Sequence, residues 1–382
     1  MMNRMGAALY IALVLGIVQV AAQAPTTPPT LAMVRERVEA GAFDEAWALV
    51  QKVSESPEVL REGITVALAR RDAPHAVEWY ERLTRRQPAG DRELLSRIGA
   101  LRAQQLLDDP DPRVVVEACR AEKPTSNAPC ILAVRRVADD TNAAMGARLA
   151  AAGVLLDARQ PGAEDMFQRF LDMALTNEPA IVADAIAHRP VLRSLQPLIS
   201  LAENGNEDAR YIATLALVRR RAKETAPLLR AVAADTQAHA ARLIAYIGLA
   251  AIGDRDALKV VNETLPLMRG RDLLEAGRAL MDLKDARGAQ ILRSMVGEGE
   301  HDLVRLEAAE AVNAFDPALA AAATRALSTS SNPWVRARAL EAATRLRISP
   351  TPAIRMAMLD ANSWVAVRAV QAVTADQAPV SR

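Results

Sequence analysis

A short motif that recurs about every 31 residues is the feature of this chain that most limits its fold. In its clearest copies, Asn332-Pro333-Trp334-Val335-Arg336 is matched by Asn362-Ser363-Trp364-Val365-Ala366. An apolar residue anchors each copy, at positions 114, 145, 182, 209, 241, 273, 304, 335 and 365. Self-similarity of this length over nine units predicts a solenoid of stacked helical hairpins, because each unit is too small to bury its apolar face alone.

Each copy of the motif has the chemistry of a helix start. An Asp, Asn or Ser side chain can cap the first turn, and Pro is tolerated there because its missing N–H has no partner within the helix. After Val335, the small or apolar residues Ala339, Ala342, Ala343 and Leu346 recur at helical spacing. The motif therefore predicts helices that bury one face against their neighbours.

The composition favours helices over strands. Half of the 382 residues are apolar (51%), yet only 3% are aromatic. Sheets are rich in aromatic and β-branched residues, whereas Ala and Leu are strong helix formers. We therefore expect an all-α fold, an α-α superhelix of about nine hairpins, with no convincing strand.

The repeated units resemble the short bacterial HEAT repeats, in which a capped helix start is followed by Pro, Val, Arg and Ala. This resemblance extends from residue 91 to residue 375. It implies a HEAT-type α-solenoid and specifies a fold much more closely than a function.

Residues 31–90 show another pattern, with Gly41 and Phe43 in a first turn, Ala46 and Ala76 as small residues, and Pro88 at the end of a helix. These residues are similar to the tetratricopeptide repeat, so two tetratricopeptide-like hairpins are expected before the HEAT-like array. Trp47 and Trp79 are expected to pack within them.

Residues 1–24 have the composition of a secretory signal peptide. Arg4 precedes an apolar run from Ala7 to Val20, and Ala22-Gln23-Ala24 is a small-x-small cleavage pattern. The run is short for a bilayer-spanning helix, although an uncleaved N-terminal anchor is the alternative. Cleavage near Ala24 predicts a periplasmic or secreted protein without a stable membrane span. Residues 25–30 are expected to be an extended Pro/Thr linker, and residues 376–382 a C-terminal tail.

The two cysteines, Cys119 and Cys130, agree with export. An even number of cysteines at short spacing in an oxidising compartment suggests a disulfide, here across one helix-turn-helix hairpin. The alternative is two buried thiols. Neither interpretation makes them catalytic or metal-binding, because the C-x-x-C and zinc spacings are absent.

Charge and motifs point to no catalytic site. Lys plus Arg number 47 and Asp plus Glu number 46, a balance that disfavours a dedicated nucleic-acid binder. None of the common catalytic, nucleotide-binding or metalloprotease motifs is found. The four histidines are far apart in sequence, and we expect distant units of a solenoid not to meet. No catalytic residue, metal site or cofactor is therefore predicted.

Two sets of residues are candidates for recognition. Four arginines follow the anchor residue in successive units and are expected either to pair with acids of neighbouring repeats or to line a groove for anionic partners: Arg210, Arg242, Arg305 and Arg336. Leu303, Trp334 and Trp364 occupy the position just before the anchor, where Arg113 and Asp208 stand in other units. The two tryptophans are expected either to pack between repeats or to form an apolar ridge that binds a partner.

These features together predict an exported, non-enzymatic scaffold that presents an extended surface to a protein or peptide in the cell envelope. Two alternatives stay open. A HEAT-repeat enzyme or chromophore-handling protein is suggested by the resemblance to bilin lyases. Nucleic-acid binding of the DNA glycosylase kind is less favoured, because it needs a basic concave face.

Overall fold

The structure is a computed structural model that describes residues 29–122, 128–178, 181, 196–220, 223–237, 239–297 and 299–375. The predicted signal peptide, most of the linker, the anchor Val182, His188 and the C-terminal tail lie outside these residues. Over the described ranges the chain forms helices and no strand. The prediction of an all-α solenoid is thus confirmed.

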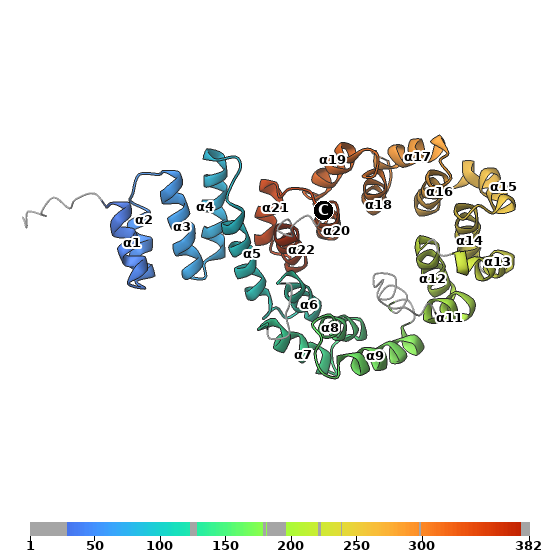
Figure 1. Cartoon of the computed structure of the whole chain (residues 1–382), viewed down its shortest axis with the longest axis horizontal. Helices are drawn as coiled ribbons and strands as arrows, with labels where there is room; N and C mark the ends of the chain where they lie inside the picture. Colours follow the sequence, from blue (N-terminus) through green and yellow to red (C-terminus); the bar gives the residue numbers. More distant parts are fainter. Residues whose placement is uncertain are drawn as a thin grey trace, which may run out of the picture.

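Four helices form an arm that projects from the rest of the molecule (Figure 1). They are α1 (Leu31–Glu39), α2 (Phe43–Val50), α3 (Pro57–Ala69) and α4 (Ala73–Arg86). Gly63 lets α3 and α4 approach closely, since a Cβ atom there would lie 1.9 Å from the Trp79 ring. Trp79 is buried and its ring centroid is 5.3 Å from that of Trp47.

The remaining helices follow a ring (Figure 1). After α5 (Arg92–Leu106), the inner helices are α6 (Pro112–Ala121), α8 (Met145–Asp157), α12 (Glu207–Arg220), α14 (His239–Ala251), α16 (Gly270–Asp282), α18 (Asp302–Val312), α20 (Pro333–Arg345) and α22 (Ser363–Ala375). The outer helices are α7 (Cys130–Asp139), α9 (Ala163–Asn177), α11 (Gln196–Asn204), α13 (Ala226–Ala234), α15 (Arg255–Thr264), α17 (Ala286–Val296), α19 (Pro317–Leu327) and α21 (Pro352–Met356).

Local sequence explains where these helices begin. Side chains of Asp111, Asn332 and Asn362 accept hydrogen bonds from backbone N–H groups two residues ahead, as helix caps do. Pro112 and Pro333 occupy the first turn. The anchors Val114, Val335 and Val365 are at most 3% exposed, so each motif starts a helix and its buried stripe as predicted.

In two units the first buried residue of the helix does not lie at the predicted anchor position. In α8 the buried small residue is Ala147, two positions after the predicted anchor Met145, and Arg148 follows it. In α16 Leu274 is fully buried, whereas the predicted anchor Leu273 is only partly buried. Neither unit has the Pro-x-Val start of α6 and α20.

The last helix closes the ring by packing against its first two helices. Valines and alanines of α22 share one hydrophobic core with Ile98 of α5 and Val114 of α6. We call this contact, together with that between α21 and α4, the seam. The expectation that distant units do not meet is wrong here, because many successive hairpins turn the chain through a full circle.

Buried polar contacts reinforce the seam. Arg355 of α21 pairs with Glu81 of α4, 274 positions away, and both side chains are nearly buried (10% and 11% exposed). Nη2 of Arg355 lies 2.9 Å from Oε2 of Glu81. In α5, Arg102 Nε donates to the Met358 carbonyl oxygen at 2.9 Å.

Cys119 at the end of α6 and Cys130 at the start of α7 form a disulfide across their hairpin. Both residues are fully buried. We expect replacement of both by Ser to lower the free energy of unfolding by about 2–3 kcal/mol, since the bridge closes a short loop. Urea unfolding of the oxidised protein and the double variant measures this; equal midpoints would contradict it.

Breaking the Arg355–Glu81 pair tests the seam. We expect Arg355→Ala to cost about 3–5 kcal/mol, because it leaves Glu81 charged and buried without its partner. Arg355→Met combined with Glu81→Leu should recover most of that loss.

Arg293→Ala, which breaks the exposed pair with Asp316, is the control and should cost less than about 1 kcal/mol. Urea midpoints measure the stability, and small-angle scattering measures whether the ring opens. An Arg355→Ala protein as stable as the control would rule out a stabilising seam pair.

Candidate functional site

The positions that carry Trp334 and Trp364 lie at the N-terminal ends of neighbouring inner helices, α20 and α22. Trp334 is 57% exposed, one of the few large apolar side chains on the described surface. Trp364 is partly buried and packs against the core of the seam. Leu303, one unit earlier, is half-buried against a small core cluster that contains Leu306 and Val335. Trp334 is therefore the exposed residue of the predicted ridge, and Trp364 and Leu303 on either side of it are partly buried.

Because the ring closes, α6 packs against α22, and the start of α6 joins the starts of α20 and α22. Arg113 holds the same motif position as the tryptophans, and its guanidinium lies 5.7 Å from the centroid of the Trp364 ring. On α22 itself, Arg368 is 4.5 Å from that centroid. Around the ring the order of this position is thus Leu303, Trp334, Trp364, Arg113, although Arg113 comes first in the chain.

These residues border a pocket of about 300 Å³, which we call the rim pocket. Its lining comes from the starts of three helices, and consists of Asp111, Arg113, Pro333, Trp334, Ala361, Asn362, Ser363 and Trp364. The pocket spans the seam, since two of its residues belong to α6 and the others to α20, α22 and the residues just before α22. An open chain would not contain it.

The charges of the rim pocket are paired with one another. Arg113 Nη2 is 2.7 Å from Asp111 Oδ2, and Arg113 Nε is 3.0 Å from Asp111 Oδ1. The hydrogen bond and charge of Arg113 hold the pKa of the Asp111 carboxyl below its usual value, although its partial burial acts in the opposite direction. Asn362 caps α22 through the backbone N–H groups of Trp364 and Val365. The lining of the pocket thus combines aromatic side chains with polar groups, and its two charges offset each other.

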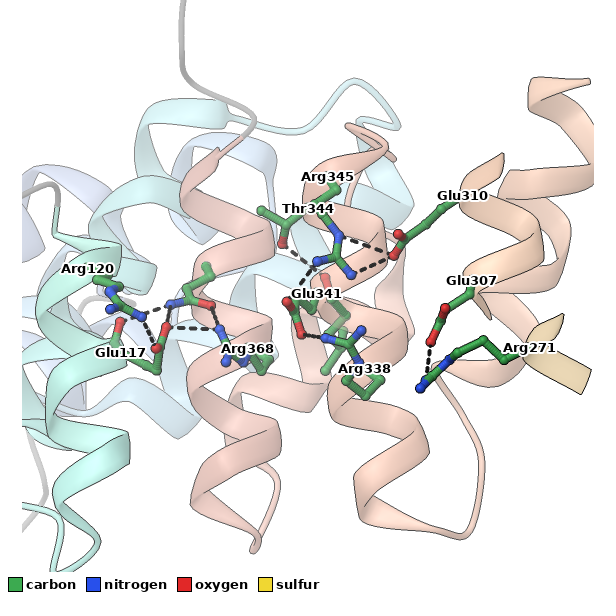
Figure 2. Close-up of polar contacts among 12 residues, drawn as sticks. Glu117, Arg120, Arg271, Glu307, Glu310, Arg338, Glu341, Thr344, Arg345 and Arg368 are labelled. Atoms are coloured by element: carbon green, nitrogen blue, oxygen red, sulfur yellow. Dashed lines mark hydrogen bonds and ion pairs between the residues drawn. The ribbon is translucent and has the colours of Figure 1, made fainter. Parts of the chain in front are cut away.

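A second polar cluster follows the inner helices on both sides of the seam (Figure 2). Glu117 of α6 accepts from Arg368 at 2.9 Å and from Gln371 at 2.8 Å, both on α22. Farther along, Arg345 of α20 donates to Glu310 of α18 at 2.6 Å. We call these residues and their continuation into α16 and α12 the inner-helix network.

In α18, α16 and α12 the network becomes more buried. Glu307 lies 2.7 Å from Arg271 and 2.8 Å from Arg219, which also reaches Glu275 at 2.6 Å. Glu275 is 3% exposed. Burial alone would raise the pKa of Glu307, but the attraction of Arg271 and Arg219 outweighs it, so its pKa lies below the usual value. The same balance, with Arg368, Arg338 and Arg345, lowers the pKa of Glu341.

Next to this cluster, the Tyr211 hydroxyl hydrogen-bonds the Asp272 carboxyl group. Burial raises the pKa of Tyr211 to about 12, and the negative charge of Asp272 adds to this. Burial also raises the pKa of Asp272 above its usual value. The Tyr211 hydroxyl therefore stays protonated near neutral pH.

The four arginines after the anchor residues make local structural contacts. Nε of Arg210, Arg242 and Arg305 donates to a backbone carbonyl near the end of the preceding outer helix. In Arg336, Nη1 donates to the backbone carbonyls of Ser330 and Ser331. Arg210 also pairs with Asp235 at 2.6 Å, and Arg336 with Asp360 at 2.9 Å, each acid lying before the next inner helix. Arg305 pairs with Asp302 of its own helix, while Arg242 lies 6.0 Å from the Tyr246 ring. Arg148 of α8 makes the same kind of carbonyl contact, to Ala138.

Sequence reasoning found the two tryptophans but not their partners. The place of Asp111 in the pocket and the contacts of Glu117 with α22 were missed, because they join units at opposite ends of the array. The shared motif position of Arg113 and the tryptophans was the available signal, and it becomes informative only once the ring is closed. The inner-helix acids gave no signal, since charged residues on any helix face look alike in sequence.

Comparisons with protein-family models, curated proteins and solved structures found no match for this chain. Among the described residues, no group of three or more His, Cys, Asp or Glu side chains is arranged to hold a metal ion. None of the described helices is both long enough and apolar enough to cross a membrane.

The paired acids of the inner-helix network should make stability depend on acidity. A carboxyl group whose pKa is lowered by folding stabilises the protein fully above its unfolded value, near 4.5, and this contribution is lost as the pH falls through the folded pKa. We expect Glu307→Gln to lower the free energy of unfolding at pH 7 by about 1–3 kcal/mol and to flatten the loss of stability on acidification.

Urea unfolding from pH 7 to pH 3 measures this effect. Glu263→Gln, which replaces an exposed carboxylate on α15, is the matched control and should follow the native protein. A Glu307→Gln protein with the native slope on acidification would show that Glu307 is not held in its charged form by the network.

Proposed function

We propose that this protein is an exported, non-enzymatic scaffold that binds a protein or peptide partner in the cell envelope. The observation that carries this proposal is the rim pocket, where the largely exposed Trp334 stands beside Trp364 and Arg113. Exposed aromatic residues beside a pocket are the usual anchors of protein recognition, because Trp buries a large area at small cost in conformational entropy.

The repeat architecture supports the same proposal. HEAT-like and tetratricopeptide-like identity of the units is itself part of the proposal, and it rests on the motifs quoted above. Arrays of this kind hold surface residues in a fixed row, since each hairpin is locked to the next. The arm and the ring together then offer a large rigid surface on which partners are held. Export follows from the composition of residues 1–24.

The inner-helix network favours a structural interpretation of most charged residues. Its arginines and acids satisfy one another across neighbouring helices. Paired arginines are poor contacts for phosphates, because binding would require the existing ion pairs to break. The proposed partner is therefore recognised through the aromatic rim, and not through a basic groove.

Selection of peptides on the immobilised chain tests this function. We expect a random peptide library to yield peptides that bind the native chain and bind Trp334→Ala at least ~10-fold more weakly, because the variant removes the exposed anchor. Fluorescence anisotropy of labelled peptides measures the affinities. Since Trp334 is mostly exposed, the variant should keep its helix content and unfolding midpoint.

Leu267→Ala is the matched control, because Leu267 is also a large exposed apolar residue (80% exposed). It lies in the connection between α15 and α16, two helices on the opposite side of the ring from the seam (Figure 1). The control variant should bind the selected peptides as the native chain does. A library that yields no binder, or binders that Trp334→Ala retains at full affinity, would overturn the rim pocket as the binding site.

A further inference from the structure

The rim pocket has a spacing that limits the shape of its ligand. Trp334 and Trp364 hold the same position on α20 and α22, which pack directly against each other. Helices in contact have axes about 8–10 Å apart, so their equivalent side chains are offset by a similar distance. A polyproline II helix advances about 9 Å per turn of three residues. Two residues three positions apart in such a segment could therefore contact the two tryptophans, one on each.

The chemistry of the pocket fits such a segment. Polyproline II recognition uses aromatic faces for the proline rings and polar groups for the exposed backbone carbonyls. Trp334 supplies an exposed face, and Trp364 supplies the part of its indole that the core, Arg113 and Arg368 leave uncovered. The charges of Arg113 and Asp111 offset each other, so this part of the lining favours a ligand without charged side chains.

The chain itself contains a segment of this kind without charged side chains. Residues 25–30 read Pro-Thr-Thr-Pro-Pro-Thr, with Pro25 and Pro28 three positions apart. The segment directly precedes α1, which lies at the free end of the arm, far from the seam (Figure 1). Because α1 lies away from the molecule's own rim pocket, we consider the rim pocket of another molecule as the place where this segment binds.

We propose that residues 25–30 of one molecule bind, as a polyproline II segment, in the rim pocket of a second copy. This inference rests on the proposed function, since it names the partner of the same pocket. Pro25 and Pro28 contact the two indoles, one on each. The contact joins two different surfaces of the same chain, so it is head-to-tail and produces chains of molecules or a closed assembly.

A ligand bound in the rim pocket would also stabilise the seam. Arg113 and Asp111 of α6 line the same pocket as the tryptophans of α20 and α22. A ligand that contacts both sides stabilises the closed ring, because it binds only the form in which the pocket exists. Self-association and closure of the ring are then linked.

Sedimentation velocity of the purified chain over a range of concentrations tests the proposal. We expect assemblies larger than the monomer to accumulate with concentration, and Pro25→Ala with Pro28→Ala to weaken association at least ~10-fold. Thr26→Ala with Thr27→Ala keeps both prolines and should leave association within about twofold. Trp334→Ala should weaken it as the proline variant does, and Leu267→Ala should not. A synthetic peptide of residues 25–30 should dissociate the assemblies.

The outcomes separate this inference from the proposed function. A chain that stays monomeric at every concentration overturns self-association, and so does association that the proline variant or Trp334→Ala retains. If selected peptides still bind at Trp334 in that case, the scaffold function stands with a different partner. If no peptide binds the rim pocket either, both proposals fail.

Discussion

The packing of α22 against α5 and α6 is the contact on which the rest of this structure depends. It converts a linear array, in which each hairpin touches only its neighbours, into a ring whose ends share one apolar core. The Arg355–Glu81 and Arg368–Glu117 pairs lie at this seam with most of their surface buried. Charges removed from water need well-placed partners, so these pairs are compatible with one alignment of the ring and disfavour others.

Closure also determines which surface residues become neighbours. Arg113 and Trp364 are 251 positions apart in the chain, yet the guanidinium stacks over the indole. The rim pocket exists because the first and last units of the ring meet there. The same residues therefore line the pocket and join the two sides of the seam, so the binding that we propose would weaken if the seam were weakened.

The arginines illustrate two uses of one side chain. Those that follow the anchors hold each outer helix to the next inner helix by donating to free carbonyl groups at helix ends, where backbone acceptors lack partners. Those on the inner helices pair with acids of adjacent units. The chain has 47 basic and 46 acidic residues. Many of these opposite charges form ion pairs with one another, which agrees with the near-neutral net charge of the chain.

The sequence by itself determined the helices and their order. Asp111, Asn332 and Asn362 are caps, and a buried valine follows each of them three positions on, because these preferences act within a single turn of helix. The helical hairpin between Cys119 and Cys130 was equally local. The predicted anchor was misplaced by two residues at Met145 and by one at Leu273.

Only the tertiary structure decided that the array closes, and with it the rim pocket and the contacts of Glu117 across the seam. Closure depends on the small rotation between successive hairpins, summed around the array, and no single repeat encodes that sum. Trp334 and Trp364 were visible as a pair because they lie in adjacent units. Arg113, Glu117 and Arg368 acquired their partners from the far end of the chain, which sequence spacing alone does not bring together.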